Sequence, residues 1–363
     1  METLNQPAFI LDLAGQSFSL LAPRGVTYSK GVLAVSDTGQ NRVFIWKNDS
    51  HKKNGTPDIV LGQPDLHEAG RNSGTSVSAS SLQYPSGIWT DGEKLIVGDA
   101  WNHRVLIWHQ LPERDGQPAD VILGQPSGEE NLPNTKGPEA HPTSRTLYWP
   151  YGVCSDGESL WIADTGNRRV LYYEKIPHEN FSPADGVIGQ NSFEERDYDN
   201  QNAIWPYSVH LGPAGQICIA DTQYFRVLVW KNKKDAFVKQ ADLLFGQPDF
   251  NANGQNQFRY TPTAHTLNWC YDACFDQEGL WVADTGNSRI LHWKSLPEVN
   301  GAPAEDLIGQ LHFEAHGEAN LRMGHEVGNE MYWPFSVTLS DDHLIVADTG
   351  NHRILFYPLN QFS

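Results

Sequence analysis

One aspartate in this chain has the side chain and the setting of a functional acid. Asp272 lies in the segment Trp269-Cys270-Tyr271-Asp272, and similar segments elsewhere in the chain carry glycine or serine in its place. A carboxylate in an apolar strand is costly to bury unless it is paired or bound to a metal. Asp272 is therefore our candidate acid. The alternative is a structural salt bridge with Arg24, which lies at the corresponding start of another segment.

Three histidines could join Asp272 as metal ligands. His141, His265 and His325 precede a tryptophan by eight, four and eight residues. Converging imidazoles suit a divalent ion such as Zn or Cu with an open coordination position, and Ca is a third candidate ion. The opposing interpretation is a set of solvent-exposed loop histidines, because the chain has no HxH or HExxH spacing.

Aromatic residues recur at the start of one predicted strand type. We call the first set the leading aromatics: Tyr84, Trp149, Trp205, Trp269 and Trp333. A second aromatic follows two residues later at Tyr151, Tyr207, Tyr271 and Phe335. Period-two spacing places both on one side of a strand. They would either pack neighbouring units together or, with Arg24 and Asp272, form the rim of a site for an apolar or planar ligand or a Pro/aromatic peptide.

A repeat of the whole chain must position these residues. An aspartate is followed five residues later by an arginine at Asp37/Arg42, Asp99/Arg104, Asp164/Arg169, Asp221/Arg226, Asp284/Arg289 and Asp348/Arg353. An aspartate that opens a tight turn accepts backbone N–H bonds, the glycine that often follows permits positive φ, and the arginine can reach the carboxylate. Catalysis needs a group once, so six copies indicate architecture.

The segments around each pair predict four short strands. In the unit that begins at Tyr84 these are YPSGIW, KLIVGDA, RVLIW and ADVILGQ. The sixth unit lacks its fourth strand, and residues 8–16 supply a matching segment at the other end of the chain. We therefore predict an all-β, six-bladed β-propeller whose last blade is closed by the N-terminal strand. The expected single domain, residues 1–363, has blades at 23–63, 85–125, 150–190, 206–247, 270–310 and 334–357 plus 8–16.

Three segments resemble a known repeat. IADTGNRRV at 162–170, VADTGNSRI at 282–290 and VADTGNHRI at 346–354 are similar to the NHL repeat. The resemblance implies the propeller fold and roles that range from protein-binding and RNA-binding scaffolds to a few lyases and hydrolases. Residues 99–102 and 221–225 depart from the pattern, because they place bulky aromatics where the turn glycine is expected. For these we expect an alternative turn packed by its own ring, or else a ligand contact.

Composition limits the partners and the compartment. The chain has 26 Lys and Arg against 44 Asp and Glu, a formal charge of -18. Such a protein repels phosphate polyanions, which argues against nucleic acid as a partner. We expect no membrane span and no export signal. Four cysteines without a CxxC motif favour reduced thiols in a cytoplasmic protein.

Variation in length is concentrated in the connectors between blades, at 64–83, 126–148, 191–204, 248–268 and 311–332. Varied loops on a regular scaffold usually carry binding sites. The chain has no nucleotide-binding glycine loop and no GxSxG nucleophile motif. We therefore predict a non-enzymatic scaffold that presents an aromatic-rimmed, loop-decorated face to a protein segment or a small ligand. The alternative is a metal-dependent lyase or hydrolase with the ion at the channel mouth.

Overall fold

The computed structural model describes residues 5–13, 16–53, 55–196, 203–317 and 330–362. These residues form six four-stranded sheets, and the described part of the chain contains short 3-10 turns but no α-helix. No helix among these residues has the length and apolarity to cross a lipid bilayer.

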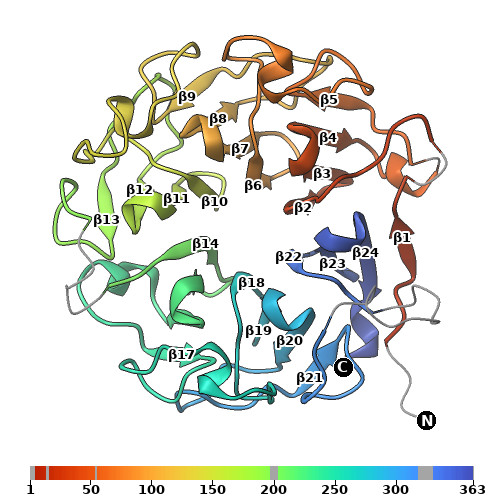
Figure 1. The fold of residues 1–363 in the computed structure, drawn as a ribbon, viewed down its shortest axis with the longest axis vertical. Coiled ribbons are helices and arrows are strands. Elements are labelled where there is room, and N and C mark those ends of the chain that lie inside the picture. Colours follow the sequence, from red (N-terminus) through yellow and green to blue (C-terminus); the bar gives the residue numbers. More distant parts are fainter. Residues whose placement is uncertain (1–4, 14–15, 54, 197–202, 318–329, 363) are drawn as a thin grey trace. The chain divides into compact units, whose positions relative to one another are not determined.

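The compact unit Leu11–Tyr207 contains three blades (Figure 1). The first blade consists of β2 (Gly25–Ser29), β3 (Val32–Asp37), β4 (Arg42–Trp46) and β5 (Ile59–Leu61). The second consists of β6 (Pro85–Thr90), β7 (Leu95–Asp99), β8 (Arg104–Trp108) and β9 (Val121–Leu123). The third consists of β10 (Pro150–Ser155), β11 (Leu160–Asp164), β12 (Arg169–Tyr173) and β13 (Gly186–Ile188).

The second unit, Met1–Ile10 with Ser208–Ser363, contains the remaining sheets, apart from the first two residues of β14. The fourth blade consists of β14 (Pro206–Leu211), β15 (Ile217–Asp221), β16 (Arg226–Trp230) and β17 (Leu243–Phe245). The fifth consists of β18 (Cys270–Phe275), β19 (Leu280–Asp284), β20 (Arg289–Trp293) and β21 (Asp306–Ile308). The sixth contains β22 (Pro334–Leu339), β23 (His343–Asp348) and β24 (Arg353–Pro358).

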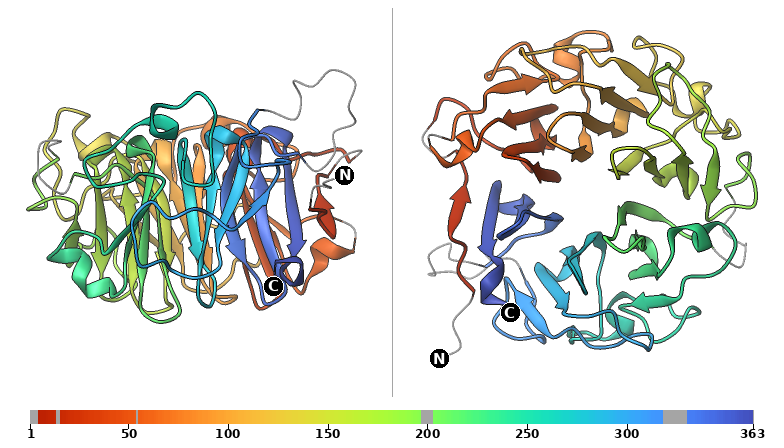
Figure 2. Two further views of the ribbon diagram at one scale, coloured as in Figure 1. Left: turned by 90° about the horizontal axis from the view of Figure 1, so that it is seen from below. Right: turned by 180° about the vertical axis from the view of Figure 1, so that it is seen from behind.

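The fourth strand of the sixth blade comes from the N-terminal segment. Strand β1 (Phe9–Leu11) pairs with β24, so that the sheet order is β1-β24-β23-β22 (Figure 2). The N–H of Ala8 donates to the carbonyl of Phe356 at 2.8 Å, and the rings of Phe9 and Phe356 have centroids 5.3 Å apart. The predicted all-β, six-bladed propeller with an N-terminal closing strand is confirmed.

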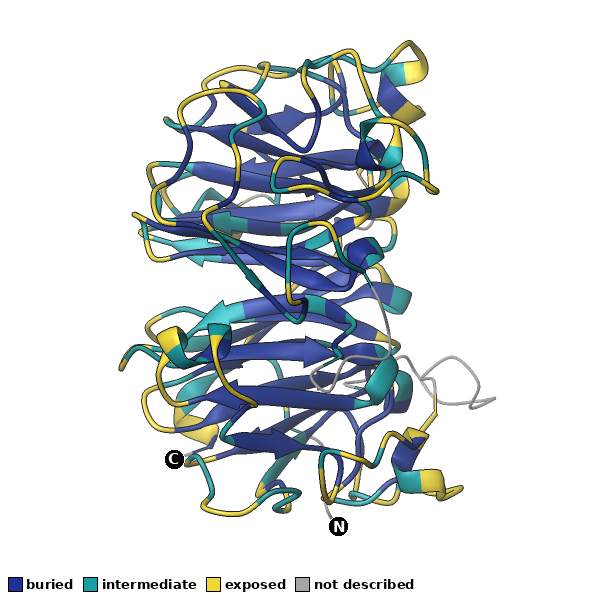
Figure 3. Ribbon diagram, turned by 90° about the vertical axis from the view of Figure 1, so that its left-hand side faces the viewer, coloured by how far each residue is buried: buried dark blue, intermediate teal, exposed yellow. Residues whose placement is uncertain are grey.

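The fixed spacing from the repeat aspartate to the aromatic that closes the third strand positions a core side chain in every blade. These side chains, each at most 4% exposed, are Trp46, Trp108, Tyr173, Trp230, Trp293 and Tyr357. The indole N–H of Trp46 donates to the carbonyl of Gly55 at 2.9 Å, nine residues on, and Trp293 does the same to Ala302 at 2.9 Å. The middle strands are almost entirely buried, whereas exposed residues concentrate in the connections (Figure 3).

Every repeat arginine bonds to the aspartate of its own blade. The Nε–Oδ2 distances are 2.6–2.8 Å in all six pairs. In the third blade Asp164 also accepts the N–H of Tyr148 at 2.7 Å, and Arg169 donates to the carbonyls of Thr143 and Thr146 in the connector. Burial raises the pKa of Asp164, and the charge of Arg169 opposes that rise. The pairs therefore tie connectors to blades, which confirms the architectural interpretation.

The expected role of the turn glycine is wrong. Positive φ occurs at the residue just before the repeat arginine, which is never glycine: Asn41, His103, Arg168, Phe225, Ser288 and His352, with φ from 52° to 57°. The glycine two residues after the aspartate is instead required by a close approach. A Cβ on Gly166 would lie 2.6 Å from the carbonyl oxygen of Tyr148.

Candidate functional site

The leading aromatics share an uncommon backbone conformation. Tyr84, Trp149, Trp269 and Trp333 have φ of 57°, 51°, 48° and 50°. Bulky residues rarely adopt this left-handed region, which costs on the order of 1–3 kcal/mol per residue. The same strained geometry at four blade starts is therefore held by the surrounding structure.

Side chains of the preceding blade help to fix this backbone conformation by accepting hydrogen bonds. The N–H of Tyr84 donates to Oδ1 of Asn41 at 3.1 Å, and the N–H of Trp149 donates to Nδ1 of His103 at 3.2 Å. Asn41 and His103 are the positive-φ residues of the turns in the first and second blades. Burial lowers the pKa of His103 to about 4, so its Nδ1 stays an acceptor at neutral pH.

Three of the leading aromatics extend into solvent. Trp149, Trp269 and Trp333 are 42%, 47% and 43% exposed. Tryptophan is usually well buried, so indoles that recur at one blade position with this exposure are not explained by core packing. These three side chains are the most exposed of the leading aromatics.

In the unit Leu11–Tyr207, several predicted residues meet in one group, which we call the Tyr84 cluster. The ring of Tyr84 stacks on Trp101 with centroids 4.7 Å apart and an angle of 13°. Tyr151 lies 6.3 Å from Tyr84 and 4.9 Å from Tyr207, and the guanidinium of Arg24 lies 5.0 Å from the Tyr84 ring centre. The structure thus brings together Arg24, Tyr84, Tyr151 and Tyr207 with Trp101, which belongs to the segment 99–102 that departs from the repeat pattern.

In the sequence, Trp101 stands where other units have the turn glycine, and this departure is the signal that marks it as a possible ligand contact. The second blade keeps the ordinary 3-10 turn at Ala100–Asn102, so the expected alternative turn is wrong there. The Trp101 ring is 38% exposed, and the guanidinium of Arg71 lies 5.6 Å from its centre. Trp101 therefore adds exposed aromatic surface beside Arg71, and Arg24 lies beside its stacking partner Tyr84.

The electrostatics of the Tyr84 cluster combine neutral phenols with cations. Burial raises the pKa of Tyr84 and of Tyr151, so both hydroxyls stay protonated. A guanidinium above an aromatic ring is attracted by its quadrupole. Arg168 makes the same contact at the fourth blade, where its guanidinium lies 3.9 Å from the ring centre of Trp205. Cations beside aromatic surface can bind planar and anionic groups together.

In the unit Met1–Ile10 with Ser208–Ser363, the second aromatics pack against one another. The rings of Tyr271 and Phe335 have centroids 4.3 Å apart at 39°. Phe335 is 9% exposed. For this pair the packing interpretation accounts for the observed contact.

Asp272 is buried, 5% exposed, and carries three hydrogen bonds. Its Oδ1 faces Nε2 of His210 at 2.8 Å and accepts the N–H of Ala273 at 3.0 Å. Its Oδ2 accepts the N–H of Val337 at 3.0 Å. The observed side-chain partner of Asp272 is therefore His210. The carboxylate links the first strands of the fourth, fifth and sixth blades.

The predicted metal ligands are found in separate settings. Nδ1 of His265 bonds to the carbonyl of Gly301 at 2.9 Å, and His141 is an exposed connector residue. His325 lies outside the described residues. No three His, Cys, Asp or Glu side chains of the described segments gather as metal ligands do. The four-residue set with Asp272 stays a prediction.

The cysteines offer little nucleophilic chemistry. All four are buried free thiols: Cys154, Cys218, Cys270 and Cys274. Burial raises the pKa of Cys270 and of Cys274 well above the usual value. A thiol that stays protonated is a poor nucleophile.

Comparison with known proteins supports the repeat assignment. The family model described as NHL repeat matches residues 332–356, which cover most of the sixth blade. No curated protein matches the sequence. Two solved structures are similar at low identity. The computationally designed Ika8 protein is 8% identical, with 94% of this chain and 74% of that chain covered and a TM-score of 0.41. Selenomethionine-substituted virginiamycin B lyase from Staphylococcus aureus is 12% identical, with 97% and 98% covered and a TM-score of 0.47.

These scores are too low for any argument about activity. The family match, the six repeat pairs and the six four-stranded sheets agree with one another. The sixth blade matches the NHL repeat, and the described residues form the six-bladed β-propeller fold.

Proposed function

We propose that this protein is a non-enzymatic binding scaffold in which the exposed leading aromatics of each unit contact an extended segment of another protein. The observation that carries the proposal is the repeated left-handed backbone at Trp149, Trp269 and Trp333, which leaves each indole more than two-fifths exposed. A strained backbone costs free energy, and such strain tends to occur at functional sites. Its repetition at several blade starts therefore supports a binding role for the exposed indoles.

The chemistry of these side chains favours a proline-containing segment. Exposed tryptophan and tyrosine rings form the grooves in which proline-rich segments dock, because the polyproline helix is already extended and loses little entropy on binding. In the unit Leu11–Tyr207, Arg24 and Arg168 lie next to Tyr84 and Trp205. Acidic residues beside the prolines would therefore strengthen binding there. The net charge of -18 argues against a nucleic acid in this role.

Binding of a short polyproline peptide, with and without flanking glutamates, tests the proposal on the full chain. Fluorescence anisotropy of the labelled peptide should show saturable binding that weakens about tenfold in Trp149→Ala and in Trp333→Ala. Leu132→Ala is the matched control, because Leu132 is an apolar connector residue that is 55% exposed and carries no aromatic ring. Equal binding by all three variants would contradict the proposal.

The second candidate function is a metal-dependent lyase or hydrolase. The observation that favours it is the buried carboxylate of Asp272 beside His210, whose side chain is 27% exposed. Metal analysis of protein purified without chelator distinguishes the two functions. Stoichiometric Zn, Cu or Ca that is lost in Asp272→Ser would support the enzyme, whereas metal-free protein that binds the peptide would support the scaffold.

A further inference from the structure

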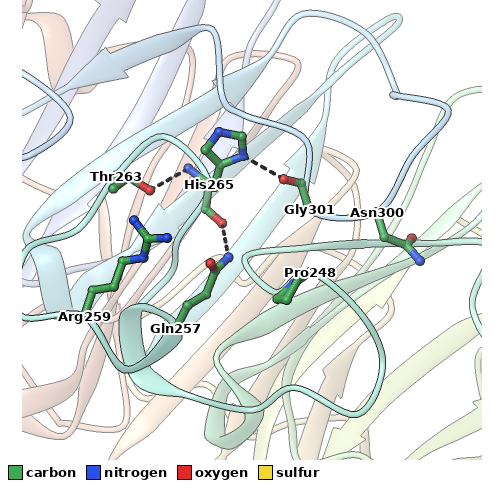
Figure 4. Close-up of a pocket in the computed structure, with 7 residues that line it drawn as sticks. All are labelled: Pro248, Gln257, Arg259, Thr263, His265, Asn300 and Gly301. Atoms are coloured by element: carbon green, nitrogen blue, oxygen red, sulfur yellow. Dashed lines mark hydrogen bonds between the residues drawn. The ribbon is translucent and has the colours of Figure 1, made fainter.

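A pocket of about 350 Å³ lies between the connector 248–268 and the loop that follows β20 (Figure 4). Its polar lining consists of Gln257, Arg259, Thr263, His265, Asn300 and Gly301, and Pro248 supplies an apolar wall. It lies entirely within the unit Ser208–Ser363 and contains none of the leading aromatics. The pocket is thus separate from the surface proposed above.

The corresponding place between the second and third blades has the same backbone bonds. The N–H of Gly301 donates to Leu244, as that of Phe181 donates to Ile122, at 3.0 and 2.8 Å. Asn300 accepts the N–H of Leu244 at 3.1 Å, and Asn180 accepts that of Ile122 at 2.9 Å. The two sites are therefore equivalent copies of one frame.

Different side chains fill the two copies. In the earlier one, the guanidinium of Arg145 bonds to the carbonyl of Phe181 and lies 5.8 Å from its ring centre. In the later one, His265 bonds to the carbonyl of Gly301, which has no side chain. A shorter side chain and a missing ring leave space that Arg145 and Phe181 occupy in the other copy.

The hydrogen bonds that the lining residues already make determine which donors remain for a ligand. The bond from His265 Nδ1 to a carbonyl at 2.9 Å requires the hydrogen on Nδ1. The hydroxyl oxygen of Thr263 accepts the N–H of His265 at 3.2 Å and keeps its own hydrogen for another acceptor. The amide nitrogen of Gln257 is engaged with the carbonyls of Gly246 and His265. Thr263 and Arg259 are therefore the main donors left for a ligand.

Arg259 contributes a positive charge to the lining of the pocket. Its guanidinium makes no hydrogen bond or ion pair with any residue that the structure describes. The corresponding residue of the earlier copy is Gly137, by alignment of the positive-φ residues Asn256 and Asn134. Phe258 and Tyr260, on either side of Arg259, are 84% and 90% exposed. A guanidinium with no described partner, in a pocket that Pro248 gives an apolar wall, is suited to a planar carboxylate that carries an apolar body.

We propose that this pocket binds a small aromatic carboxylic acid, with its carboxylate on Arg259 and Thr263 and its ring against Pro248. A volume of about 350 Å³ is at the lower end of small-molecule sites, so it fits a single-ring ligand. Because the site uses none of the tryptophans of the scaffold surface, its occupancy is independent of peptide binding there.

Titration of the full chain with benzoate by isothermal calorimetry or ligand-observed NMR tests the proposal. We expect saturable binding, with benzamide at least about tenfold weaker because it lacks the charge. Arg259→Gln should weaken benzoate binding about tenfold or more. Arg114→Gln is the matched control, since Arg114 is also exposed with no described partner, and it should leave binding unchanged.

A second variant tests the location. His265→Arg reproduces the residue of the filled copy and should reduce benzoate binding, although it adds a positive charge. Benzoate binding that persists in both His265→Arg and Arg259→Gln, equal binding of benzamide, or no saturable binding to the parent chain would each overturn the proposal. Trp149→Ala should leave benzoate binding unchanged, which separates failure of this proposal from failure of the scaffold.

Discussion

Nε2 of His210 on β14 lies 2.8 Å from Oδ1 of Asp272 on β18, which joins two neighbouring blades through a buried carboxylate. Such a contact can stabilise the protein only if both partners are present, because the carboxylate alone would be left buried with less compensation.

We therefore predict strong coupling between these two residues. His210→Ala should lower the free energy of unfolding by about 1–3 kcal/mol, and Asp272→Ser, which installs the residue of the sixth blade at Ser336, should lower it less. The double variant should show a coupling energy of at least about 0.5 kcal/mol in urea denaturation. Strictly additive changes would mean that the pair contributes no net stability.

The repeat ion pairs should be sensitive to removal of one partner. Arg169→Met leaves the fully buried carboxylate of Asp164 without its cation, and we expect a loss of about 3–5 kcal/mol in the free energy of unfolding. Urea denaturation followed by tryptophan fluorescence measures it. Lys30→Met, which removes one partner of the exposed pair with Glu93, should leave stability nearly unchanged.

Replacement of the turn glycine by alanine should destabilise the protein. Gly166→Ala places a Cβ 2.6 Å from the Tyr148 carbonyl oxygen, so we expect a loss of about 1–3 kcal/mol in thermal or urea unfolding. The second blade shows how a larger residue is accommodated. The N–H of Trp101 lies 3.2 Å from its carbonyl partner, compared with 2.7 Å for Gly166. Trp101→Ala should accordingly change stability little, and a large loss there would contradict this account.

Stability should fall in mild acid because of His103. Its folded-state pKa is about 4, against 6.5 for the ordinary residue, because burial disfavours the charged ring. The unfolded chain therefore takes up a proton between pH 6.5 and 4 that the folded chain does not, so this contribution is full above pH 6.5 and is lost as pH falls toward 4. The loss is on the order of 3 kcal/mol.

His103→Asn is the matched variant for this pH dependence. Asn41 already accepts the N–H of Tyr84 at the equivalent position, so asparagine should keep the hydrogen bond to Trp149. Urea midpoints measured from pH 7 to pH 4 should fall less steeply in the variant. Unchanged slopes would show that other groups dominate. His51 also contributes, because burial lowers its pKa to about 4.

The sequence was sufficient for the blades and insufficient for the contacts between them. The spacing from Asp99 to Trp108 reflects hydrogen-bonding register inside one sheet, which the repeat encodes directly. The His210–Asp272 bond depends instead on how two first strands pack side by side, and no spacing within a blade encodes that. This is why the sequence did not identify His210 as a partner of Asp272.

Local geometry explains the remaining differences. Glycine at Gly166 is needed for the close approach of a carbonyl, and sequence alone does not distinguish that need from positive φ. The pocket at His265 arises from a side chain that Gly301 lacks, in comparison with Phe181. The leading aromatics could be found from their spacing, but their exposure depends on a backbone conformation that tryptophan rarely adopts.

The pairing of β1 with β24 also constrains how the protein is made. During translation, residues Phe9–Leu11 are synthesised before the first five blades, whereas their hydrogen-bonding partner β24 is synthesised after them. The sixth blade therefore cannot assemble until the other five have been synthesised, and β1 remains without its partner strand while they are made.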